Sequence, residues 1–271
     1  MGKKGWIIFS SIFAAAVIGL QVYEIVVKGI VDTHSITRTV ILLLCAGLTF
    51  FRKNSGFSDT RAIKKAYKRA YGELIGSAFE GRPKQEKYFY AALHNYNNNK
   101  FNAALDKLED LETECESIDE RFAVTFFRAL CLDDMNCPAD AVKLYEKAAT
   151  LKRDSTAISN AGICYSHMGD FESAERCYLD AADIDNNAIT YNNLAQLYME
   201  KDEYEKALDY AMTALGIDAK CREALDAAAV CNAMLGNEDE YNEYLRRAVI
   251  CGSDADAVKH YIDLLKFKDK D

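Results

Sequence analysis

The chain has 271 residues, of which 50% are hydrophobic and 28% are charged, so it is long enough for one or two packed domains and too apolar for a disordered polypeptide. Residues 1–84 hold thirteen Lys and Arg against five Asp and Glu, whereas residues 85–271 hold twenty against thirty-seven. The acidic larger part argues against nucleic acid as a partner, because phosphates would be repelled, and it favours either a solvated acidic surface or a basic partner.

Two apolar runs lie near the start of the chain. Residues 6–27 include one acidic residue, Glu24, and are long enough for a helix that crosses a bilayer, which needs about twenty residues. Residues 36–51 are fewer, but Arg38 near their start can extend its charged end to the interface. These runs predict a membrane anchor over residues 1–56, made of two helices and an outer loop over 29–37. A cleaved signal peptide is the alternative for the first run, although its apolar stretch is long and no typical cleavage site follows Gly19.

Basic residues are most frequent directly after the second run, between residues 52 and 69. Because basic residues accumulate on the cytoplasmic side of membrane spans, the pattern predicts an integral membrane protein with two spans and both termini in the cytoplasm.

Residues 58–79 predict an amphipathic helix, opened by Ser58 or Asp59 and followed by a linker, so that residues 57–84 form a juxtamembrane segment that ends around Pro83. Its basic face has two interpretations. It either lies on anionic lipid, or it is the first packing helix of the next domain. In the first case the lipid-facing residues are Lys64, Lys65, Lys68 and Arg69.

The rest of the chain is repetitive. Small residues recur in three columns at intervals of 37, 33, 33 and 34 residues. The first column is Ala92, Ala129, Gly162, Ala195 and Ala229; the second is Ala104, Ala141, Ala174 and Ala207, with Tyr241 in the last unit; the third is Leu111, Ala148, Ala181, Ala214 and Ala248. A small residue lets a neighbouring helix approach closely, and nearby aromatic residues fill the remaining gaps, so the columns predict stacked helix pairs.

Within each unit, two helical patterns are joined by a short turn such as "HMGDF" (167–171) or "EKDEY" (200–204), and an aromatic residue, Phe101, Phe171 or Tyr204, begins the second helix. This arrangement resembles the tetratricopeptide repeat family over residues 86–255, most clearly in "AISNAGICYSHMGDFESAERCYLDAADID" (157–185). It departs from the family pattern at Asn186 and Ala219, where proline is frequent, and at Asn95 and Asn232, where tyrosine is expected.

The resemblance implies an all-α fold, with a right-handed α-solenoid of about five helix pairs over residues 85–271. The end of such a stack must be closed. Residues 253–267 predict that closing helix, with Ser253 as its N-cap.

In this family the first helices of successive units line a groove that binds peptides. The matching positions are Phe89, Tyr90, Leu93, Tyr96, Phe126, Phe127, Leu130, Asn160, Ile163, His167, Asn192, Asn193, Gln196 and Glu200. An exposed aromatic patch of this size should meet a partner, and asparagine amides can pair with a peptide backbone. The alternative for the aromatic residues is burial beneath the helix over 58–79.

The chemistry of the groove bears on its partner. Some family members bind a carboxylate terminus through basic residues, which are absent at the matching positions here. Asp133, Asp134 and Glu200 suit a protein or peptide with basic and apolar residues instead.

No motif for phosphate, dinucleotide, metal or nucleophilic chemistry is present. Nine cysteines without a CxxC pair and four scattered histidines predict reduced thiols, buried at Cys131, Cys164, Cys177 and Cys231, and no zinc site. His167 and Asp170 lie in a turn where polar residues are expected. We therefore expect no enzyme activity, metal, cofactor or small-molecule substrate.

Two functional hypotheses remain. The first is a membrane-tethered scaffold that presents the groove at the cytoplasmic face. The second is a component of a membrane assembly, such as an envelope or secretion complex, in which the transmembrane hairpin is the working part and the solenoid regulates it. An enzyme that depends on His167 or Asp170 is a third and weaker interpretation.

Overall fold

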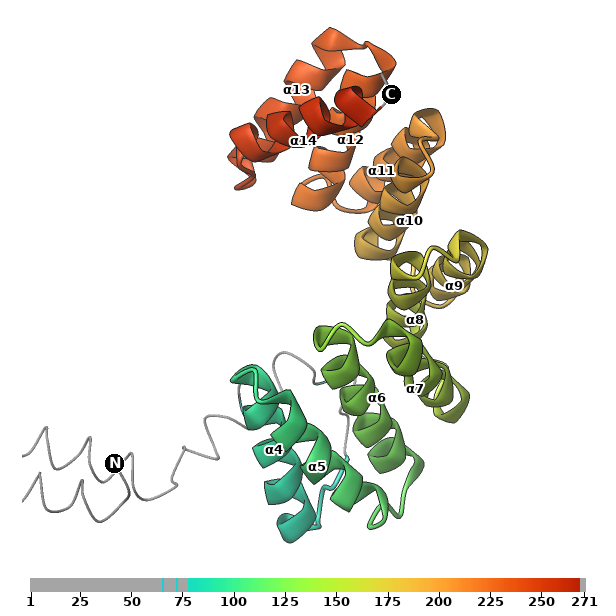
Figure 1. Cartoon of the computed structure of the whole chain (residues 1–271), viewed down its shortest axis with the longest axis vertical. Coiled ribbons are helices and arrows are strands. Elements are labelled where there is room, and N and C mark those ends of the chain that lie inside the picture. Colours follow the sequence, from blue (N-terminus) through green and yellow to red (C-terminus); the bar gives the residue numbers. More distant parts are fainter. Residues whose placement is uncertain (1–64, 66–71, 73–77, 269–271) are drawn as a thin grey trace, which may run out of the picture. The chain divides into compact units, whose positions relative to one another are not determined.

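A computed structural model describes residues 65, 72 and 78–268 (Figure 1). The chain divides into residues 1–63 and 64–271, and all described residues belong to the second unit. The predicted spans over 6–27 and 36–51 lie outside the described residues, as do Lys64, Lys68 and Arg69 of the predicted lipid-facing set. Lys65 is helical and exposed.

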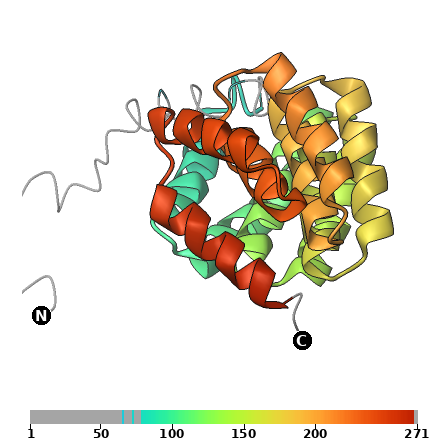
Figure 2. The same cartoon turned by 90° about the horizontal axis from the view of Figure 1, so that it is seen from above.

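Five helix pairs and one final helix make up residues 83–268, with no strand among them (Figures 1 and 2). The pairs are α4 (Pro83–Asn97) with α5 (Phe101–Glu112), α6 (Ile118–Asp134) with α7 (Pro138–Leu151), α8 (Ser155–His167) with α9 (Phe171–Ile184), α10 (Ala188–Glu200) with α11 (Tyr204–Ile217) and α12 (Arg222–Leu235) with α13 (Glu238–Ile250), followed by α14 (Ala255–Lys268). The predicted all-α solenoid of five pairs and a closing helix is confirmed.

The predicted localisation is wrong. Between residues 78 and 268, and at the two described positions before them, no helix combines the length and the apolar character that crossing a bilayer requires.

The turn within each pair has the same backbone geometry. One residue per turn adopts a positive φ, between 56° and 78°, namely Asn99, Asn136, Gly169, Asp202 and Gly236. The next amide donates a hydrogen bond to the carbonyl five residues earlier in all five turns, as in Asp170 to Tyr165, which closes the first helix. Asn, Asp and Gly tolerate this left-handed conformation better than other residues. The second helices begin at Phe101, Phe171 and Tyr204, as predicted.

Local signals also place the helix starts. The only two prolines of the chain, Pro83 and Pro138, open α4 and α7, where a missing N–H is tolerated. Side chains of Asp154, Asp170 and Asn187 cap α8, α9 and α10.

The start of α14 corrects a prediction. Asp254, and not Ser253, accepts the amide hydrogen bonds of its first turn, because the Ser253 hydroxyl is used elsewhere and donates to Asp226.

The three small columns form the core of the stack. Every member is buried except Tyr241, which is half-buried. Larger side chains such as Tyr145, Tyr198 and Leu194 are buried between them. The small residues therefore lie where helices meet, as the repeat predicted.

The helices form two layers. In residues 83–268, first helices contact the next first helices at α4 and α6, α8 and α10, α10 and α12, and α12 and α14, whereas second helices make no extensive contact with one another. Helices α6 and α8 are joined chiefly through α7. The layer whose helices approach each other more closely is the shorter side of a curved stack. We call the surface of the first-helix layer the inner face.

Candidate functional site

The aromatic half of the predicted groove is not exposed to solvent. Phe89, Tyr90, Leu93, Phe126 and Phe127 are all buried, and Tyr96 and Leu130 are half-buried. Their rings pack on one another, with centroids 5.7 Å apart for Phe89 and Phe127 and 5.6 Å apart for Phe126 and Phe127. These residues are the core of the first two units, so their predicted role in an open groove is corrected.

Residues just before α4 take part in this core. Phe79 is buried, and its ring centroid lies 5.2 Å from that of Phe89. The backbone at Phe79 has a φ of 61°, and Gly81 follows with 82°. This tight turn directs the ring of Phe79 into the core. The aromatic residues are therefore buried. The helix over 58–79 that was predicted to cover them lies mostly outside the described residues.

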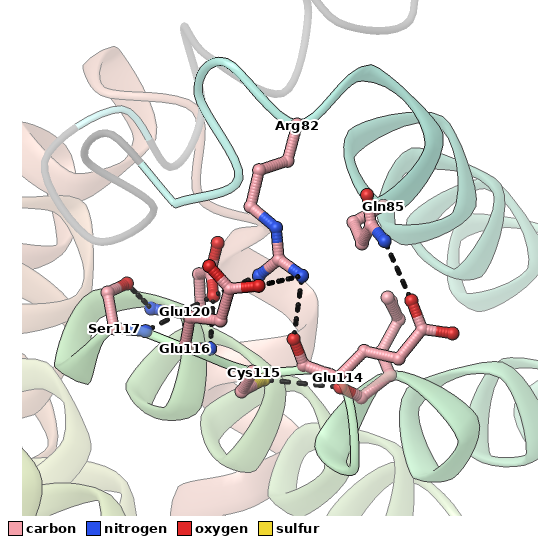
Figure 3. Close-up of polar contacts among 8 residues, drawn as sticks. Arg82, Gln85, Glu114, Cys115, Glu116, Ser117 and Glu120 are labelled. Atoms are coloured by element: carbon pink, nitrogen blue, oxygen red, sulfur yellow. Dashed lines mark hydrogen bonds and ion pairs between the residues drawn. The ribbon is translucent and has the colours of Figure 1, made fainter.

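Arg82 connects the turn before α4 to the start of the second unit through hydrogen bonds and ion pairs (Figure 3). Its guanidinium donates to Glu120 Oε2 at 2.7 Å and to the Glu114 carbonyl at 2.9 Å, and it pairs with Glu116 at 3.0 Å. Glu120 also accepts from the Glu116 amide and forms a capping box with Ser117 at the start of α6. These contacts hold residues that are 32 to 38 positions apart in sequence.

The polar half of the predicted groove does lie on the inner face. His167, Gln196 and Glu200 are exposed, and Asn160, Ile163 and Asn193 are half-buried. Asn192 is buried, and its Oδ1 has no hydrogen-bond partner in the described chain. The reachable part of the predicted site is therefore a polar strip across α8 and α10.

Two hydrogen bonds join the helices of this strip. Asn193 Nδ2 donates to Ser159 Oγ at 3.1 Å, and the Ser166 hydroxyl donates to Glu200 Oε2 at 2.7 Å. Each links residues 34 positions apart, so each joins equivalent helices of neighbouring units. They fix the Asn193 amide and the Glu200 carboxylate. The amide keeps one N–H donor and its carbonyl acceptor, and the carboxylate keeps further acceptor capacity.

The inner face continues into a pocket that the sequence analysis missed. It lies between α10, α12 and α14, has a volume of about 370 Å³, and is floored by Met199, Ala227, Val230 and Val258. Gln196, Glu200, Glu223, Asp226 and Tyr261 also line it. Asp226 occupies in the fifth unit the repeat position of Asn192 in the fourth. Extending the groove positions by one unit would have found it, but the contribution of α14 would not have followed.

Asp226 is held in an unusual environment. Its Oδ2 accepts from the Ser253 hydroxyl at 2.8 Å and lies 3.8 Å from Arg222 Nη1, whereas its Oδ1 is buried with no hydrogen-bond partner in the described chain. Burial raises the pKa of Asp226, and Ser253 and Arg222 only partly oppose this shift. The carboxylate therefore lacks part of the stabilisation that water or a cation would give it.

Another half-buried acid, Asp133, lies where α6, α7 and α8 meet. Burial raises the pKa of Asp133, although the Cys164 thiol and His167 act in the opposite direction. Burial also raises the pKa of Cys164 to about 12, so this thiol is protonated and unreactive at neutral pH. The nearby Tyr145 hydroxyl is buried without a partner at hydrogen-bonding geometry in the described chain. Asp133 is thus part of a packed seam and less available to a partner than the sequence suggested.

The remaining cysteines have structural explanations, and so do His167 and Asp170, the two residues of the weaker enzyme interpretation. Cys131, Cys164 and Cys231 are buried as predicted, Cys177 is only half-buried, and the eight cysteines of the described chain are free. Asp170 caps α9 by accepting from the Ser173 amide, and His167 is exposed at the end of α8. Among the described residues, no three His, Cys, Asp or Glu side chains are grouped to hold a metal.

The fold and the repeating contacts define the class of this protein as a tetratricopeptide-like α-solenoid. Residues 155–220, which form the third and fourth units, match the family model described as tetratricopeptide repeat. The resemblance inferred from the small columns is therefore confirmed for the repeat.

Known proteins are similar to parts of this chain in sequence or in structure. Bovine BBSome complex member BBS4 is 24% identical over 106 residues, which cover 39% of this chain and 20% of that protein. The match thus spans about a fifth of that curated relative. Among solved structures, a crystal structure of MamA is 16% identical with a TM-score of 0.52, covering 59% of this chain and 93% of that one. The Pseudomonas aeruginosa pilF structure is 16% identical with a TM-score of 0.58, covering 70% and 88%. At this identity the two structures show the fold alone.

Proposed function

We propose that this protein is an interaction scaffold whose inner face binds an extended segment of another protein. The observation that carries the proposal is the polar strip of α8 and α10, in which Asn193 and Glu200 are fixed by hydrogen bonds to the neighbouring unit. Groups that are already ordered lose little entropy when a ligand binds. The proposal implies no turnover.

The chemistry of the strip suits a peptide backbone. An amide side chain both donates and accepts, so Asn160 and Asn193 together can pair with the N–H and C=O groups of an extended chain. The two residues occupy the same repeat position in adjacent units, which gives a repeating ligand repeating partners. The comparisons support this class of role, since the bovine relative is by name a member of a complex.

Selection from random peptides tests the proposal. Phage-displayed dodecapeptides are selected on the full-length chain, and the strongest binders are measured by fluorescence anisotropy. The double substitution Asn160→Ala and Asn193→Ala should weaken binding about fivefold or more, because two amide partners are lost at about 0.5–1.5 kcal/mol each.

A matched control uses asparagines of the second helices. Asn102 and Asn242 are exposed on α5 and α13, and Asn102→Ala with Asn242→Ala should leave peptide affinity unchanged. Thermal unfolding of both variants shows whether the fold is kept. The proposal fails if no peptide is selected, or if the peptides bind the Asn160 and Asn193 variant as tightly as the control.

A further inference from the structure

The pocket between α10, α12 and α14 combines an apolar floor with an acidic rim. Met199, Val230 and Val258 are buried beneath it, whereas the carboxylates of Glu200, Glu223 and Asp226 line its sides. None of the side chains that line the pocket in the described structure is basic. At about 370 Å³, it lies at the lower end of the range of about 300–1,000 Å³ for pockets that bind small groups.

The carboxylates of the pocket are not neutralised from within. Arg222 is the basic side chain next to them, and it pairs closely with Glu223 at 2.6 Å but only distantly with Asp226 at 3.8 Å. Glu200 accepts one hydrogen bond from a neutral hydroxyl, that of Ser166. Asp226 keeps one oxygen without a hydrogen-bond partner in the described chain. Of the three carboxylates, Glu223 and Asp226 therefore share Arg222 and Glu200 has a neutral partner, which leaves a surplus of negative charge at the pocket.

We propose that this pocket receives an arginine side chain of the partner segment that the inner face binds. The apolar floor suits the aliphatic part of the side chain, and the surplus carboxylates suit its guanidinium. This proposal rests on the proposed function and adds the chemistry of one partner residue to it.

Arginine fits the pocket better than lysine. Its guanidinium is more weakly hydrated than an ammonium group, so moving it over an apolar floor is less unfavourable. Its planar donor set can also reach two carboxylates at once. Tyr261 of α14 lines the pocket and is 43% exposed as a residue, so its aromatic ring can contact an entering guanidinium.

The pocket adjoins the polar strip. Gln196 and Glu200 line it and also lie on α10 beside Asn193, so a segment that pairs with Asn160 and Asn193 can place its next side chains over the pocket. One bound segment can therefore use both features.

The proposal is tested on the full-length chain by a double-mutant cycle, in which an arginine of the bound peptide and the carboxylates of the pocket are changed separately and together. The probe is a peptide selected on that chain, synthesised with fluorescein and in forms in which each arginine in turn is replaced by citrulline, which keeps the shape and removes the charge. One replacement should weaken binding to the wild type about tenfold or more, because a charge-assisted hydrogen bond is lost. The same replacement should have little effect on a variant carrying Glu200→Gln, Glu223→Gln and Asp226→Asn. Replacing that arginine by lysine should give an intermediate affinity for the wild type.

The control removes equal charge elsewhere. Glu172→Gln, Glu205→Gln and Glu243→Gln change three exposed residues of second helices, and this variant should discriminate arginine from citrulline as the wild type does. Selected peptides without arginine, or an arginine effect that persists in the pocket variant, would overturn the arginine pocket and leave the scaffold intact. If no peptide is selected at all, both proposals fail.

Discussion

Gly162 on α8 lies so close to Tyr178 on α9 that no side chain fits between them. A Cβ atom at Gly162 would be 2.7 Å from Tyr178 Cε1 and 2.9 Å from Cδ1. The ring is only 3% exposed, and it is enclosed by Ala174 and by Leu194 and Leu197 of the next unit. The smallest residue of the first column thus allows a large one to fill the space between three helices.

Because of this contact, we expect Gly162→Ala to destabilise the protein, although alanine is normally the better residue within a helix. Alanine favours the helix by about 1 kcal/mol over glycine, whereas overpacking a core usually costs about 1–3 kcal/mol. The net loss in the free energy of unfolding should therefore be up to about 2 kcal/mol by chemical denaturation. The matched control is Gly216→Ala on α11, where nothing lies within 4 Å of the added carbon, and it should stabilise. Equal, stabilising effects of the two substitutions would show that Tyr178 moves freely.

The positive φ of each intra-pair turn gives a second prediction, with opposite signs at two equivalent positions. Gly169 has a φ of 78° and open space around it, so Gly169→Ala adds backbone strain alone and should destabilise by about 1 kcal/mol. Asn136 has a φ of 59° in the preceding unit, and Asn136→Gly should stabilise by up to about 1 kcal/mol, because glycine adopts this conformation without a Cβ penalty. Both are measured as shifts in the midpoint of urea unfolding. Shifts of the same sign would contradict a shared left-handed geometry.

These two examples show why the repeat could be predicted from the sequence. Each unit makes the same contacts over 33 to 37 residues, so small residues at the contacts and Asn, Gly or Asp in the turns recur at the same interval. When every unit makes the same contacts between residues close in sequence, the residues at those contacts recur periodically in the sequence. The helix starts at Phe171 and Tyr204 followed from it to the residue.

The site was harder to predict because it depends on contacts that do not repeat. The position of Phe79 requires a left-handed backbone at a phenylalanine, which residue preferences disfavour, so the sequence predicted a helix through Phe79 and not the turn that packs its ring on Phe89. The pocket also requires residues of α14, and the three small columns end before this helix. Reading Phe126 and Phe127 as exposed followed the family pattern at positions where this chain instead builds its core.

Arg82 forms ion pairs with two acidic residues, Glu116 and Glu120, that differ in how far they are buried. Glu120 is buried at the start of α6, whereas Glu116 is 75% exposed in its side chain, and the Arg82 guanidinium reaches both at 2.7 and 3.0 Å. Burial by itself raises the pKa of Glu120. The Glu116 amide, the Arg82 side chain and the Ser117 amide together outweigh that effect and lower it.

The lowered pKa of Glu120 predicts how stability depends on pH. A carboxyl whose pKa is lower in the folded state stabilises the fold above its unfolded pKa, about 4.3, and this contribution disappears as the pH falls through the folded value. Glu120→Gln should therefore lower the free energy of unfolding near pH 7 by roughly 1.5–3 kcal/mol, because hydrogen bonds to a charged group are lost. The difference from the wild type should shrink as urea unfolding is repeated toward pH 3. Glu116→Gln is the control, and it should change stability by less than about 1 kcal/mol, since exposed ion pairs contribute little. Equal losses in the two variants at pH 7, or a Glu120→Gln deficit that stays constant into acid, would mean that the buried carboxylate does not hold this junction.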